Sequence, residues 1–131
     1  MDDDQFFSGI ESRADLKSRD EAAAAAEATL RVLGERIARG QARDLADSLP
    51  ADLGDALTAS GDEQADEFPP GEFVERVRDY EREQIAEIDV TATQLHVQVV
   101  LESLAGSVDG GTWNDTRTQL PSEYSRLYET G

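Results

Sequence analysis

The residues of this sequence that could carry acid–base chemistry are one histidine, His96, and many carboxylates. A general acid or base needs a partner or substrate within hydrogen-bond reach. No nucleophile or metal ligand lies at a suitable spacing from His96, and Glu102 is too far along the same predicted helix to meet it. The chain has no cysteine, which excludes thiolate and disulfide chemistry. We therefore expect His96 to be structural and the protein to have no catalytic residues.

The carboxylates also offer no recognisable metal or cofactor site. Asp109, Asn114 and Asp115 surround a Gly-Gly pair, but the D-x-[DN]-x-[DN]-G spacing and closing glutamate of a calcium loop are missing. No glycine-rich phosphate loop or metalloprotease motif occurs. Burial on an apolar face would raise the pKa of an acid, but the acids near the helix stripes are expected on polar faces: Glu27, Glu35, Glu87 and Glu102. We expect no metal ion and no cofactor.

Three aromatic residues near the C-terminus, Trp113, Tyr124 and Tyr128, are the candidate interaction residues. They could form a patch that binds a partner or ligand. Aromatic side chains at the end of a helical unit more often close its core, and we favour that interpretation.

Charge is the strongest compositional signal, with 29 acidic residues against 12 basic ones, a net charge of −17. An acidic surface gains no counterion release from nucleic-acid phosphates or anionic lipids, so we expect neither as a partner. The acid serves either to bind basic partners or to keep the protein in solution at high salt. Its even spread and the single lysine, Lys17, favour adaptation to high salt.

The elements that would position these residues are helices. From Asp20 to Gly40 the apolar residues recur every three or four positions, which predicts one face of an α-helix. Ser18 with Glu21 has the pattern of a capping box, and Gly40 is the predicted helix terminator. The run from Ala22 to Ala26 favours helix and allows close helix approach.

A second stretch, Thr91 to Gly111, is a fainter copy of the first. A shift of 71 residues places Leu30 on Leu101, Leu33 on Leu104 and Gly40 on Gly111. The same shift aligns two Leu-Pro steps, and a shift of 67 aligns Phe6, Phe7 and Ile10 with Phe73, Val74 and Val77. Repeats of this kind indicate a duplicated helical unit.

The predicted organisation is a single all-α domain over residues 1–131, a compact helical bundle built from two related four-helix repeats. Repeat one spans 4–57, a polar linker with a Pro-Pro pair spans 58–71, and repeat two spans 72–128. The shorter predicted helices are Asp4–Arg13, Gln41–Leu49, Ala51–Leu57, Glu72–Ile85, one beginning at Trp113 and one beginning at Pro121.

The start of the sequence is acidic and lacks the basic region and apolar core of a signal peptide. No run approaches the roughly 18 apolar residues that a membrane span needs. We expect a soluble cytoplasmic protein that does not enter a membrane.

The paired motifs resemble those of the family known as domain of unknown function 2267. The closest match is Trp113 followed by Gln119-Leu120-Pro121. The resemblance covers nearly the whole chain and implies a compact all-helical fold of two related halves. It implies no activity and no site residues. The motif residues are Phe6/Ile10, Leu30/Leu33, Gly40 and Leu49-Pro50-Leu53, then Phe73/Val77, Leu101/Leu104, Gly111 and Leu120-Pro121-Tyr124.

Two function classes fit these observations. The first is a non-enzymatic protein-interaction module adapted to high salt, whose partner is an unknown protein or a second copy of the chain. The alternative is a small-molecule binding protein or enzyme that uses a cavity between the two repeats. A contiguous exposed apolar patch would favour the first. A pocket between the repeats with convergent polar groups would favour the second.

Overall fold

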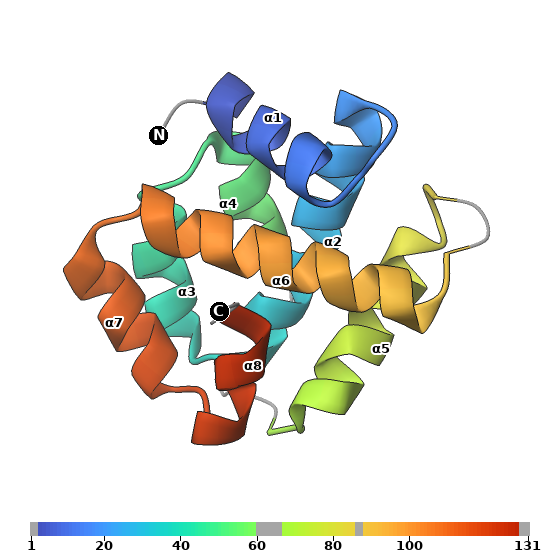
Figure 1. Ribbon diagram of the computed structural model, residues 1–131. Coiled ribbons are helices and arrows are strands. Elements are labelled where there is room, and N and C mark those ends of the chain that lie inside the picture. The colour runs from blue at the N-terminus through green and yellow to red at the C-terminus, as the bar shows by residue number, and fades with distance from the viewer. Residues whose placement is uncertain (1–2, 60–66, 86–87, 129–131) are drawn as a thin grey trace.

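The computed structural model describes residues 3–59, 67–85 and 88–128, and within these ranges the fold is all-α, as predicted (Figure 1). None of the helices in these ranges combines the length and apolarity needed to cross a bilayer. The elements are α1 (Asp3–Arg13), α2 (Arg19–Arg36), α3 (Arg39–Ala46), α4 (Ala51–Leu57), α5 (Pro70–Glu81), α6 (Val90–Ser107), α7 (Gly110–Thr118), the 3-10 turn η1 (Ser122–Tyr124) and α8 (Ser125–Tyr128).

The two long helices, α2 and α6, form the centre of the molecule and pack against each other (Figure 1). Each begins at a residue whose side chain caps it: Ser18 accepts a hydrogen bond from the amide of Glu21, and Asp89 accepts one from the amide of Ala92. These caps satisfy amides that have no partner within the helix. Thr91, the other predicted start of the second long helix, lies inside its first turn.

The predicted glycine terminators are wrong. Helix α2 ends before Ile37 and α6 before Val108, and both of these buried residues are extended, with φ of −108° and −97°. Gly40 lies inside α3, and Gly111 lies inside α7, which begins earlier than the predicted Trp113. A β-branched residue prefers extended backbone, and burying its side chain turns the chain directly into the next helix. A left-handed glycine is therefore not needed.

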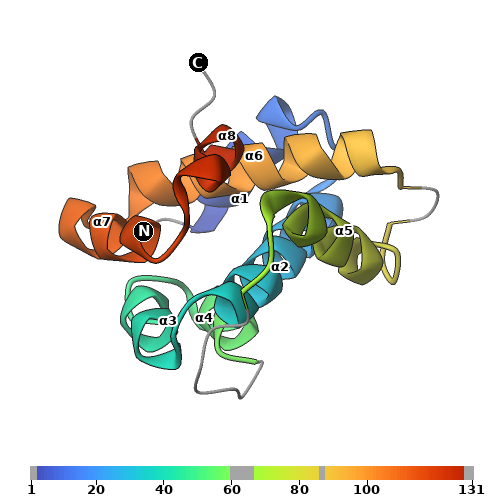
Figure 2. The ribbon, with the colours of Figure 1, turned by 90° about the horizontal axis from the view of Figure 1, so that it is seen from below.

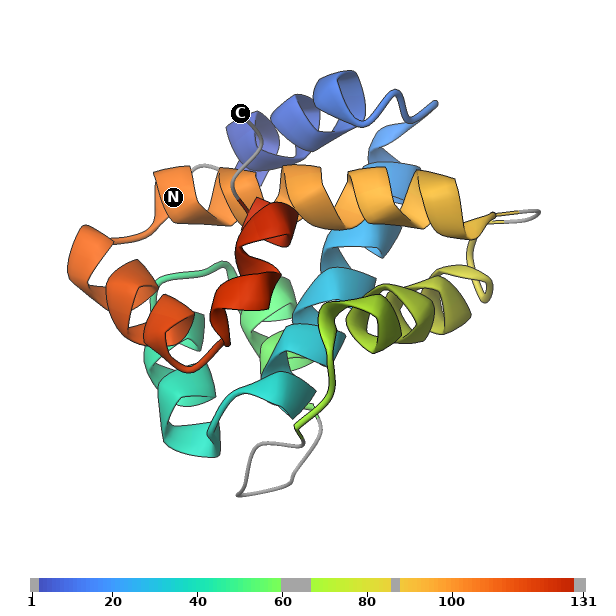
Figure 3. The ribbon, with the colours of Figure 1, turned by 60° about the horizontal axis from the view of Figure 1, so that its bottom comes forward.

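The shorter helices surround the crossed pair. Figure 2 shows α3 and α4 on one side of α2, with α6 and α8 on the other, and Figure 3 shows α1 lying along α6. Helix α1 packs on both α2 and α6, and α5 does the same. Helix α4 packs on α2, α8 on α6, and α3 on α7. Helix α5 is shorter than predicted, starting at Pro70 and ending at Glu81.

The core is formed by the predicted apolar stripes. Leu30 and Leu33 of α2 and Leu101 and Leu104 of α6 are fully buried. The alanine run of α2 is almost entirely buried as well, since only Ala23 is partly exposed. Small side chains there let neighbouring helices approach α2 closely, as the sequence indicated.

Candidate functional site

The predicted aromatic residues do not occupy one kind of environment. Tyr124 is fully buried, with its ring edge-on to Phe73. Trp113 is half-buried on α7 and packs against the core. The side chain of Tyr128 lies outside the described residues. A surface role therefore stays a prediction for Trp113 and Tyr128, while Tyr124 lies inside the protein.

Tyr124 belongs to a buried cluster around a guanidinium. Arg36, at the end of α2, is 5% exposed, and its Nε donates hydrogen bonds to the carbonyl of Phe68 at 3.1 Å and to the Tyr124 hydroxyl at 3.2 Å. The Tyr124 hydroxyl in turn donates to the Phe68 carbonyl. Burial raises the pKa of Tyr124, against the opposing effect of Arg36. The cluster joins the end of α2, the residues before α5 and η1, so its role is structural.

A second buried group, which we call the buried polar cluster, consists of Glu81, Thr93 and His96. Glu81 is fully buried, and its two carboxylate oxygens accept from the Thr93 hydroxyl at 2.8 Å and lie 2.6 Å from Nδ1 of His96. A carboxylate can only accept, so this contact places a proton on Nδ1. His96 itself is 3% exposed.

The buried polar cluster corrects two expectations from the sequence. His96 has an acidic partner, and one acid does lie on an apolar face. Glu81 was missed because it is 15 residues from His96 and is brought to it by the turn between α5 and α6. The signal was present, since Phe73, Val77 and Glu81 follow one another at four-residue spacing and therefore share one stripe.

A third polar group, the α2–α5 seal, closes the junction of those two helices with charges. Arg76 of α5 donates to Glu35 of α2 at 2.9 Å and to Glu72 one turn earlier at 2.9 Å. The Tyr80 hydroxyl donates to Glu35 at 2.8 Å, and Arg31 lies 5.4 Å from the centre of the Tyr80 ring. Burial and the hydrogen bond to Glu35 raise the pKa of Tyr80.

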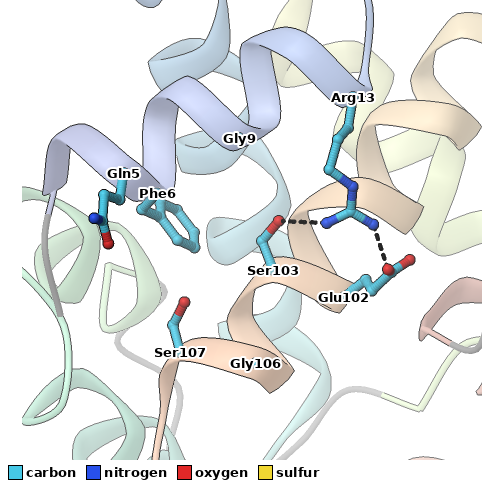
Figure 4. A pocket seen from close by; sticks show the side chains of 8 residues that line it. All are labelled: Gln5, Phe6, Gly9, Arg13, Glu102, Ser103, Gly106 and Ser107. Carbon is cyan, nitrogen blue, oxygen red and sulfur yellow. Dashed lines mark hydrogen bonds and ion pairs between the residues drawn. The ribbon is translucent and has the colours of Figure 1, made fainter.

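The junction of α1 and α6 is instead an open groove of about 660 Å³ (Figure 4). At one end Arg13 of α1 pairs with Glu102 of α6 and donates to the Ser103 hydroxyl at 3.4 Å. The close-up shows Phe6 directed into the space between the helices. The groove is lined by Gln5, Phe6, Gly9, Arg13, Glu102, Ser103, Gly106 and Ser107.

The α1–α6 groove is equipped to bind rather than to transfer protons. Its side chains supply one guanidinium, one carboxylate, one amide, two hydroxyls and one aromatic ring. These groups can orient a polar ligand through directional hydrogen bonds. The buried polar cluster is not part of its lining. Within the described ranges, no three His, Cys, Asp or Glu side chains are placed to hold a metal ion.

These features define a class of small all-α protein in which short helices pack around a crossed pair, with an open polar groove between α1 and α6. The chain belongs to the family described as an uncharacterized conserved protein (DUF2267), which matches it over residues 3–127. The resemblance read from the paired motifs is thereby confirmed. No curated protein matches the sequence.

Proposed function

We propose that the protein is a binding protein that takes a small polar ligand in the α1–α6 groove. The observation that carries this proposal is the groove itself. Its volume of about 660 Å³ lies in the range of small-molecule sites, roughly 300–1,000 Å³. It lies between a helix of the first predicted repeat and a helix of the second, where the small-molecule alternative requires a site. Arg13, Ser103 and Glu102 converge at one end of it.

The protein-interaction module is the second candidate. Two large apolar side chains of α6 face solvent, Val90 at 37% and Leu95 at 40% exposure. Exposed apolar residues support contact with another protein when they form a patch. Two residues five positions apart on one helix make a smaller contribution than the groove, which is why the groove decides the order of the proposals.

Two glycines make the groove testable without disturbing the fold. A Cβ added at Gly9 or Gly106 would meet no atom within 4 Å. Glutamine is also a better helix former than glycine by up to about 1 kcal/mol. The double variant Gly9→Gln/Gly106→Gln therefore places two side chains in the groove of a folded protein. Gly40→Gln on α3 is the matched control, because a Cβ there is equally unobstructed.

The experiment is a ligand-observed NMR screen of amino acids, sugars, nucleosides and small carboxylic acids. We expect at least one class to bind the wild-type protein and Gly40→Gln but not the double groove variant. Equal binding to all three proteins, or no binding to any, would count against a site in the groove. Loss of a captured protein partner in Leu95→Gln would then favour the interaction module.

A further inference from the structure

The two junctions, α1–α6 and α5–α2, are built from matching pieces of the chain. The N-caps of α2 and α6, Ser18 and Asp89, are 71 residues apart, and so are the residues that end them, Ile37 and Val108. Helices α3 and α7 begin 71 residues apart as well. With the shift of 67 for the first helix of each half, α1 corresponds to α5. The α1–α6 junction therefore has a counterpart in the α2–α5 junction.

Contacts support this correspondence at the level of single residues. In the groove Arg13 meets Glu102, and at the counterpart positions Tyr80 lies under Arg31. The position of Gly9 in α1 is that of Arg76 in α5, and the position of Gly106 in α6 is that of Glu35 in α2. The two glycines thus stand where the α2–α5 seal has an ion pair of 2.9 Å.

The groove is therefore the space that the seal fills at the other junction. One guanidinium and one carboxylate occupy it there, and hydrogen atoms replace both side chains here. The chain does not use the freed space, because a Cβ at either glycine would meet nothing within 4 Å. Glycine is also costly inside a helix, so packing within the chain gives no reason for it at Gly9.

We propose that the α1–α6 groove binds a small zwitterion of the amino-acid or short-peptide type. This inference rests on the proposed function, because it names the ligand class of the same groove. A zwitterion brings one cationic and one anionic group on a single molecule, the combination that fills the counterpart junction. The groove keeps a complementary pair, in which Arg13 and Ser103 can donate to a carboxylate and Glu102 can accept from an ammonium group.

Charge separates a zwitterion from singly charged ligands. The lining of the groove carries one positive and one negative side chain, whereas the whole chain has a net charge of −17. A small anion is repelled by the field of such a molecule, and a small cation is attracted to acidic groups all over its surface. A ligand without net charge is not subject to either effect. Its binding depends on the local pair in the groove.

The length of the groove sets the size of the ligand. From Gln5 to Arg13 the eight helical steps of α1 cover about 12 Å. An extended dipeptide spans roughly 7 Å and leaves room for hydrogen bonds to Gln5 or Ser107 at the other end. The bridge between Arg13 and Glu102 is partly exposed, with side chains 43% and 36% accessible, so it can open to admit the ligand.

The first test is a titration of the ¹⁵N-labelled protein with glycylglycine. N-acetylglycylglycine, which is only an anion, and glycylglycinamide, which is only a cation, are the matched controls. We expect glycylglycine to shift the amides of Gly9, Gly106 and Ser107. The two singly charged analogues should bind at least about tenfold more weakly, since each lacks one charge-assisted contact.

The second test rebuilds the seal with the double variant Gly9→Arg/Gly106→Glu. We expect it to be folded, to show favourable coupling in a double-mutant cycle and to lose the glycylglycine shifts. The control Gly40→Arg/Gly71→Glu carries the same charges outside the groove and should keep them. Shifts that persist in the rebuilt protein, or equal binding of the three peptides, would overturn the zwitterion inference.

The two proposals fail in different ways. If another small polar compound shifts the groove amides while glycylglycine does not, the ligand class is wrong and the proposed function stands. If no compound shifts those amides, both are wrong.

Discussion

At the scale of single residues, the most informative side chains are those of the buried polar cluster. Its members stand in the second half at positions where the first half, under the same shifts of 67 and 71, has small apolar residues. Those residues are buried too, so the first half shows that the fold does not require polar groups there. They are Ala14, Ala22 and Ala25.

We expect His96→Leu to destabilise the protein by about 3–5 kcal/mol, because it leaves the buried Glu81 carboxylate with Thr93 as its remaining partner. The sequence alone suggested that His96 could be replaced without effect. The triple variant Glu81→Leu/Thr93→Val/His96→Leu removes the charge together with its partners. It should be more stable than His96→Leu, as measured by urea unfolding. A triple variant that is less stable than the single one would show that the cluster itself stabilises the fold.

The two tyrosines with raised pKa values predict how stability changes in alkali. For Tyr80 and Tyr124 the main cause is burial, which disfavours the phenolate. Below pH about 10 the hydroxyls are protonated in both the folded and the unfolded chain. Above it the unfolded chain releases its protons first, so the free energy of unfolding falls as pH rises.

The absorbance of phenolate near 295 nm, measured against pH, should show two of the three tyrosines titrating above the ordinary value. In Tyr80→Phe we expect one of these two steps to disappear and the alkaline loss of stability to shrink. Three tyrosines that all titrate near pH 10 in the folded protein would contradict the prediction.

At the scale of helices, the sequence predicted the existence of nearly every element but not how the long ones end. Apolar periodicity and capping residues are local signals, and they located α2, α4 and the start of α6 closely. The glycine terminators failed because burial of Ile37 and Val108 decides where the long helices stop. Burial of one residue depends on the packing of distant helices, which local sequence does not contain.

The same reasoning explains what could be predicted of the candidate site. Arg13, Glu102 and the two glycines were visible as residues, but their meeting requires α1 to lie along α6. The aligned repeats contain the necessary information, because Gly9 and Gly106 replace the charged residues Arg76 and Glu35 of the other copy. Only the structure shows that Arg76 and Glu35 are in contact, and hence what their replacement leaves open.

The closest helix approach in the described part of the chain depends on one glycine of α2. A Cβ at Gly34 would lie 1.9 Å from the backbone oxygen of Leu57 in α4, a distance that no relaxation of a side chain can relieve. We expect Gly34→Ala to lose at least about 1–3 kcal/mol despite the higher helix propensity of alanine. Gly40→Ala, where a Cβ meets nothing, should be neutral or slightly stabilising. Equal midpoints of urea unfolding for the two variants would refute this close contact.

At the scale of the whole molecule, the predicted duplication and the high negative charge are the two properties still to be tested. Matching caps, helix starts and pairwise helix contacts support the duplication. If the halves are equivalent, equivalent core positions should carry similar energetic weight. Leu30 of α2 and Leu101 of α6 are one such pair, and both are fully buried.

We expect Leu30→Ala and Leu101→Ala each to cost about 2–5 kcal/mol, the usual loss for a fully buried leucine. The measurement is urea unfolding of the two single variants. A loss below about 0.5 kcal/mol at either position, which is typical of a surface site, would show that the core is not shared equally between the halves.

The net charge of −17 makes the stability of the protein sensitive to salt. We propose that the acidic surface is an adaptation to high salt. At 0.1 M salt the Debye length is about 10 Å, and carboxylates on neighbouring helices repel one another; at 1 M it is about 3 Å, and most of this repulsion is screened. The thermal midpoint should therefore rise steeply between 0.1 and about 2 M potassium chloride.

A matched variant separates repulsion from general salt effects. Asp52 and Asp55 are exposed on α4 and face Glu27 across a shallow depression. The variant Asp52→Asn/Asp55→Asn removes two of these charges, so it should be more stable than the wild type at 0.1 M and the difference should vanish at molar salt. Potassium chloride and sodium sulfate at equal ionic strength should act alike if screening is the cause, whereas sulfate should act more strongly if it favours burial. A midpoint that does not change with salt would leave the acidic surface to be explained by basic partners, the other reason for which a chain accumulates carboxylates.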